Sequence, residues 1–116
     1  MTEPQQILIV EDEPLIAMML EDFLEVLEKR PAGTADTVAG ALARLDEGGV
    51  DAAILDVNLR GGEISTPVAE ALAARGIPFV FATGGGEESV DDRFRDRPRL
   101  TKPFTMDGVA KALESL

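Results

Sequence analysis

The sequence contains no cysteine and no histidine, and it also lacks tryptophan and tyrosine. Without cysteine, the chain can form no disulfide, thiol nucleophile or cysteine metal site. Without histidine, it lacks the usual zinc ligand and the commonest general base. Enzymes that depend on either residue are therefore excluded, and any chemistry must come from carboxylates, hydroxyls and amines.

The sequence also has few basic residues and no long apolar run. No run approaches the roughly 18 residues of a membrane span, and no basic, apolar leader opens the chain. The 11 Lys and Arg residues are outnumbered by 22 Asp and Glu, which gives a net charge of -11. Because direct nucleic-acid binding usually needs a basic face, this charge argues against it. We expect a cytoplasmic protein that binds neither membranes nor nucleic acids.

The 116 residues suit one domain, and short apolar runs alternate along them with amphipathic segments. We expect strands at 7–10, 32–35, 52–56, 78–82 and 99–101, and helices at 14–28, 36–48, 66–75 and 105–115. The first helix is predicted to bury both Met18 and Met19. This order predicts a doubly wound α/β fold, with a five-stranded parallel sheet, right-handed crossovers and helices on both faces. Residues 1–116 then form a single domain without an output domain.

The interval from 84 to 97 fits this pattern least well. It is highly charged, and its large apolar residues are Val90 and Phe94. Their spacing of four allows a short helix, but two apolar side chains offer little to dock it on a core. We therefore predict a mobile segment here.

Polar side chains follow four of the predicted strands. In chain order they are Glu11 and Asp12, Asp56, Thr83 and Lys102. The carboxyl ends of parallel strands meet at one edge of a sheet, which is where open α/β sheets bind ligands. We expect these residues to meet in one shallow pocket.

The residue types at this edge are suited to phosphoryl transfer. Three crowded carboxylates repel one another and favour a bound cation, and oxygen ligands favour Mg²⁺. The Asp56 carboxylate is already an anion at neutral pH and needs no general base to attack phosphorus. The Thr83 hydroxyl, the Lys102 ammonium and the metal are suited to neutralising the transferred group. We therefore predict that Asp56 accepts a phosphoryl group.

Four motifs carry a resemblance to a known family. They are Ile7–Asp12, Ile54–Asp56, Ala82-Thr83-Gly84 and Lys102-Pro103-Phe104. With these motifs, the chain resembles the receiver domain of bacterial two-component response regulators over essentially its whole length. The resemblance implies a flavodoxin-like sheet with strand order 2-1-3-4-5.

The resemblance also implies a role for each site residue. Asp56 would be the phosphorylation site and Thr83 the switch hydroxyl, with Lys102 as its cationic partner. Mg²⁺ would be bound by Glu11, Asp12, Asp56 and the backbone carbonyl of Asn58. The protein would then be a switch and not an enzyme, apart from its self-catalysed phosphoryl transfer. A sensor histidine kinase or a phosphotransfer protein would supply the phosphoryl group, and the output would be docking on another protein or onward transfer.

Two features depart from the general family pattern. Receivers usually have an aromatic residue three positions before the lysine, but this chain has Arg99 there. The interval between Thr83 and Lys102 is also short. Residues 81–84, Phe-Ala-Thr-Gly, resemble a narrower group of stand-alone alphaproteobacterial receivers. That group is associated with HWE-type or related histidine kinases, and some members act in general stress signalling.

Two alternatives remain open at this stage. One is a degenerate receiver that binds a partner without being phosphorylated, which the missing aromatic residue favours. The other is a phosphatase of the haloacid-dehalogenase type, which also uses an aspartyl nucleophile and Mg²⁺. Such phosphatases carry a second Asp two residues after the nucleophile, whereas this chain has Asn58.

Overall fold

The computed structural model describes residues 5–59, 63–83, 94, 97–101 and 104–116. Its strands are β1 (Gln6–Val10), β2 (Arg30–Ala35), β3 (Ala52–Asp56), β4 (Phe79–Thr83) and β5 (Arg99–Thr101). Its helices are α1 (Pro14–Val26), α2 (Val38–Asp46), α3 (Thr66–Ala74) and α4 (Met106–Glu114). The strands form one parallel sheet in the order β2-β1-β3-β4-β5, which confirms the predicted fold. Within the described residues, no helix is long and apolar enough to cross a membrane.

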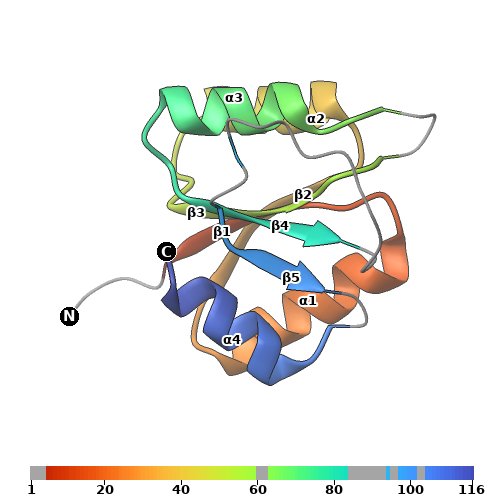
Figure 1. Ribbon diagram of the computed structural model, residues 1–116, viewed down its shortest axis with the longest axis vertical. Helices are drawn as coiled ribbons and strands as arrows, with labels where there is room; N and C mark the ends of the chain where they lie inside the picture. The colour runs from red at the N-terminus through yellow and green to blue at the C-terminus, as the bar shows by residue number, and fades with distance from the viewer. Residues whose placement is uncertain (1–4, 60–62, 84–93, 95–96, 102–103) are drawn as a thin grey trace.

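The helices cover both faces of the sheet (Figure 1). Helices α2 and α3 lie on one face, and α1 and α4 lie on the other. Each face has its own apolar core: one joins β-strand side chains to Leu45 and Leu72, and the other joins them to Leu20 and Val109. Every residue of β3 and β4 is buried, as expected for central strands of a parallel sheet.

Local signals in the sequence set the ends of several helices. Pro14 occupies the first position of α1, where its missing N–H costs nothing. The hydroxyl oxygens of Thr37 and Thr105 accept hydrogen bonds from the backbone N–H groups of Gly40 and Gly108, both at 3.0 Å. These threonines therefore cap α2 and α4, close to the predicted helix starts.

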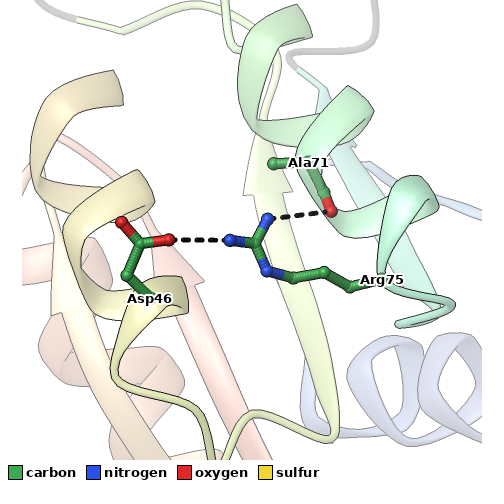
Figure 2. A network of polar contacts seen from close by, with 3 residues as sticks. All are labelled: Asp46, Ala71 and Arg75. Carbon is green, nitrogen blue, oxygen red and sulfur yellow. Dashed lines mark hydrogen bonds and ion pairs between the residues drawn. The ribbon is translucent and has the colours of Figure 1, made fainter.

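A polar contact joins α2 to α3 on the outer surface of the domain. The Arg75 guanidinium lies 2.7 Å from the Asp46 carboxylate and also donates to the Ala71 carbonyl at 3.3 Å (Figure 2). The two charged side chains are 39% and 74% exposed, so solvent screens the pair. An exposed pair of this kind contributes on the order of 0–1 kcal/mol, so packing is the main attachment of these helices.

The prediction that α1 buries both methionines was wrong for Met18. Met19 packs against the core, but the side chain of Met18 is 58% exposed. The buried face of α1 is formed by Ala17, Leu20 and Leu24. Successive helical residues are rotated by about 100°, so the residue that follows Ala17 is turned away from that face.

The predicted mobile segment at 84–97 lies outside the described residues, except for Phe94 and Arg97. Phe94, one of the two apolar side chains expected to offer little for docking this segment, is only 5% exposed. Its ring centroid lies 5.7 Å from that of Phe79 and 6.4 Å from that of Phe81. The Arg97 guanidinium lies 4.6 Å from the Phe79 centroid, within the range of a cation–π contact. Two residues of this interval are thus attached to β4.

Candidate functional site

The parallel register brings the ends of the central strands to one edge of the sheet. Val10, the last residue of β1, is paired with Leu55, so Glu11 follows at the level of Asp56. Asp56 ends β3 and is paired with Ala82, one residue before the end of β4 at Thr83. The arrowheads of β4 and β5 point to the same side in Figure 1. Residues far apart in the sequence therefore share this edge.

Three carboxylates gather at this edge. One oxygen from each of Glu11, Asp12 and Asp56 lies within 4.8 Å of the others. Glu11 and Asp56 are only 2% and 4% exposed, and Asp12 is partly exposed. Burying like charges close together is unfavourable unless a cation or hydrogen bonds compensate for it. The all-oxygen donor set fits Mg²⁺, which is held in proteins by one or two carboxylates together with waters.

Asn58 lies just beyond this cluster in a short antiparallel pairing with Ile64. The Ser65 N–H donates to the Val57 carbonyl at 3.0 Å, and the Leu59 N–H donates to the Glu63 carbonyl at 2.8 Å. These bonds flank Asn58 and Ile64, which therefore form a non-hydrogen-bonded pair. The pairing uses neither the N–H nor the carbonyl of Asn58, so it leaves that carbonyl available to a ligand.

The remaining predicted site residues belong to β4, β5 and the chain after β5. Thr83 is 7% exposed, and its strand partner is Thr101. Lys102 follows Thr101 in the sequence and lies outside the described residues. Arg99 is exposed on β5, where it is paired with Phe81. The structure therefore brings Glu11, Asp12 and Asp56 together and places Thr83 at the same edge.

Sequence reasoning missed two residues of the loop after β3. The buried Ser65 donates its hydroxyl to the Val57 carbonyl at 3.2 Å. A carboxylate oxygen of Glu63 accepts from the Val38 N–H at the start of α2, at 3.1 Å. A serine just before a helix is ordinarily interpreted as an N-cap, so the sequence carried no signal for either contact.

A cavity borders the acidic cluster on the side of β2. Its lining is formed by Glu11, Asp12, Pro14, Ala17, Thr34 and Asp36. Asp36 thus adds a fourth carboxylate near the site, although the sequence indicated for it only a place at the start of a helix. Of the two buried carboxylates, Glu11 lines this cavity.

Comparison with solved structures finds close relatives. SdrG from Sphingomonas melonis Fr1 is 81% identical, with a TM-score of 0.89, and the match covers 99% of this chain and 98% of that one. The receiver domain of PhyR from Erythrobacter litoralis is 27% identical, with a TM-score of 0.80 and coverage of 97% and 88%. PhyR from Brucella abortus is 34% identical, with a TM-score of 0.78, and this chain covers 46% of it. No curated protein matches the chain.

The family comparison agrees with the structural one. Residues 7–114 match the response regulator receiver domain, and this span includes every site residue predicted from the sequence. The strand order and the acidic cluster at the carboxyl edge are what the resemblance implied. The chain therefore belongs to the response regulator receiver domain family.

Proposed function

We propose that this receiver is phosphorylated on Asp56 in a Mg²⁺-dependent reaction. The observation that carries the proposal is the cluster of Glu11, Asp12 and Asp56, whose carboxylate oxygens lie within 4.8 Å of one another. Asp56 ends a fully buried strand, which holds its backbone in place at the sheet edge. A rigidly held carboxylate beside a cation site is suited to nucleophilic attack on phosphorus.

The metal would be held by Glu11, Asp12, Asp56 and the Asn58 carbonyl. Glu11 and Asp56 are buried, while Asp12 and the adjoining cavity open toward solvent. This arrangement leaves room for the waters that Mg²⁺ usually retains. When bound, the ion supplies positive charge to the phosphoryl oxygens.

The transfer itself needs only the carboxylate and a phosphorylated donor. A carboxylate oxygen of Asp56 forms a bond to phosphorus while the phosphorus–nitrogen bond of a donor phosphohistidine breaks. The imidazole leaves with the electron pair and takes up a proton, and an acyl phosphate forms on Asp56. Thr83 and Lys102 would contact the phosphoryl oxygens, and the buried end of β4 supports this role for Thr83.

The output of the receiver would be a protein contact. We propose a histidine kinase, of HWE or related type, or a phosphotransfer protein as the donor, and a protein as the target. The resemblance to stand-alone receivers supports a place in stress signalling. A link to sigma-factor control is supported by one related structure, of which this chain covers 47%, described as the anti-anti-sigma factor PhyR from Bartonella quintana. The single-domain organisation predicted from the sequence stays a prediction.

Removal of the metal should block phosphorylation. Incubation with a phosphorylated histidine kinase or acetyl phosphate should add one phosphoryl group in Mg²⁺, measured by intact mass, and none in EDTA. Asp12→Asn should lower the rate of adduct formation at limiting Mg²⁺ by about tenfold or more, because the affinity of oxygen sites depends on ligand charge.

Asp36→Asn is the matched control for Asp12→Asn. It removes the same charge from the same cavity, but Asp36 does not belong to the three-carboxylate cluster. We expect a much smaller change in rate for this variant. Equal losses for the two variants would mean that general electrostatic attraction, and not metal ligation by Asp12, explains the effect.

Thr83 should link the phosphoryl group to the rest of the domain. Beryllofluoride with Mg²⁺ imitates the phosphoryl group, and a BeF₃-activated conformation is known for the 81% identical SdrG. In the wild type we expect changes in amide NMR signals mainly within 83–104, because the switch acts through the end of β4. Thr83→Val keeps the shape of the side chain without the hydroxyl. It should still bind beryllofluoride but show smaller changes within 83–104, and unaltered changes there would refute the switch role.

A further inference from the structure

Three successive backbone pairings join the two sides of the loop that follows Asp56. Val57 is joined to Ser65, Asn58 is paired with Ile64, and Leu59 is bonded to Glu63. Val57 and Leu59 are buried and Asn58 is exposed, as expected for an extended segment with alternating side chains. The backbone of Asn58 is therefore held from both sides, and the pairing with Ile64 uses neither its N–H nor its carbonyl.

Ser65 donates two hydrogen bonds at the end of this loop nearest Asp56. Both its N–H and its hydroxyl donate to the Val57 carbonyl, at 3.0 and 3.2 Å. The side chain of Ser65 is 1% exposed, so water does not compete for the hydroxyl. A single buried carbonyl, one residue before Asn58, is thus bound by two donors of the same residue.

The hydroxyl of Ser65 is not used for the helix that it precedes. Ser65 is the N-cap of α3, but its side chain makes no capping hydrogen bond. Serine is favoured at N-caps because its oxygen accepts from the first turn of the helix. Here the second helical position is Pro67, which has no N–H to donate. The hydroxyl instead donates to the carbonyl of Val57, the residue that follows Asp56 and the end of β3.

We propose that Ser65 is a positioning residue for the metal site: by holding the Val57 carbonyl, it fixes the backbone of Asn58 so that its carbonyl can bind Mg²⁺. This inference rests on the proposed function. Glu63 holds the other end of these loop pairings. Its backbone carbonyl accepts a hydrogen bond from the Leu59 N–H, and its carboxylate accepts one from the Val38 N–H at the start of α2. Groups that orient metal ligands contribute to affinity without touching the metal.

The test measures the Mg²⁺ affinity of the folded protein by NMR titration, at a temperature where each variant is fully folded by circular dichroism. Ser65→Ala should weaken Mg²⁺ binding by about tenfold, as is typical when a supporting group is removed. Ser115→Ala is the control, because it removes a serine hydroxyl that donates to the Ala112 carbonyl at the end of α4. It should leave the Mg²⁺ affinity unchanged.

Exposed Glu63 provides a second pair of variants that does not alter the core. Glu63→Ala and Glu63→Gln remove the same charge, but only Gln keeps an oxygen that can accept from the Val38 N–H. We expect Glu63→Ala to bind Mg²⁺ about threefold more weakly than Glu63→Gln.

The outcomes separate this inference from the function on which it rests. If the wild type binds Mg²⁺ and Ser65→Ala binds it equally well, Ser65 has only a structural role and the inference is overturned. If Ser65→Ala does not fold, equal affinities of Glu63→Ala and Glu63→Gln overturn the inference. Absence of Mg²⁺ binding in the wild type would contradict the proposed function itself.

Discussion

Asp56→Asn should abolish phosphorylation, with no phosphoryl adduct detected by intact mass under conditions that phosphorylate the wild type. The asparagine amide has nearly the same size and shape as the carboxylate, but it is not an anion and is a poor nucleophile toward phosphorus. Asp56 is 4% exposed at the end of a buried strand, which holds its carboxylate at a fixed place at the sheet edge. The expected effect is therefore a loss of the whole signal, which is the largest change among our predictions.

The control for Asp56→Asn is an equivalent substitution away from the site. Asp46 ends α2 and is 74% exposed in its pair with Arg75. Asp46→Asn should be phosphorylated like the wild type, and circular dichroism should show both variants folded. An adduct that persists in Asp56→Asn would place the phosphoacceptor at another residue.

The same experiment discriminates between the functions left open by the sequence. A wild-type chain that accepts no phosphoryl group from any donor, while Asp56→Asn keeps full function in cells, would indicate a phosphorylation-independent binding module. Steady hydrolysis of a phosphomonoester would instead indicate a phosphatase. A single stable or slowly decaying adduct on Asp56 is the result expected of a receiver.

Phe94→Ala should lower the free energy of unfolding by about 3 kcal/mol, the lower end of the range for truncating a buried phenylalanine. Phe94 is 5% exposed and packs its ring against those of Phe79 and Phe81 on β4. Truncation removes both ring contacts and leaves a cavity beside a central strand. Because small domains are stable by only about 5–15 kcal/mol, this loss is large. Urea denaturation followed by circular dichroism would measure it.

Leu15→Ala is a suitable control for the Phe94 experiment, since it also truncates a large apolar side chain. Leu15 is 80% exposed on α1 and contributes little burial, so a change of less than about 0.5 kcal/mol is expected. If Phe94→Ala also changed stability by so little, Phe94 would not be a true part of the core around β4.

The arrangement of strands and helices was accessible from the sequence because it is controlled by local patterns. The apolar runs at 7–10 and 52–55 predicted central strands, and both are buried in the sheet. Pro14, Thr37 and Thr105 marked helix starts through backbone chemistry that acts within one turn. The β2 strand was less evident because its residues, Arg-Pro-Ala-Gly-Thr-Ala, have weak strand propensity. The structure also shows a register shift opposite Ile7 and Leu8, where Gly33 has a φ of +143°.

The meeting of the acidic residues was also predictable, and for a topological reason. Glu11, Asp12 and Asp56 each follow a strand, and the carboxyl ends of parallel strands lie at one edge of the sheet. Their oxygens lie within 4.8 Å of one another, as that reasoning required. The roles of Asp56 in phosphorylation and of Lys102 as its partner stay predictions.

The fold, the family and the sheet edge that carries Glu11, Asp12, Asp56 and Thr83 could be predicted from the sequence, because hydrophobic periodicity and the residues at strand ends are local features of the chain. The burial of Phe94, the exposure of Met18 and the closure of the loop after β3 by Ser65 became visible in the folded domain alone. These outcomes depend on which groups from other elements lie within reach: two phenylalanine rings on β4, the rotation of α1 and the Val57 carbonyl. No spacing along the chain encodes such contacts, since they exist only once the elements have packed.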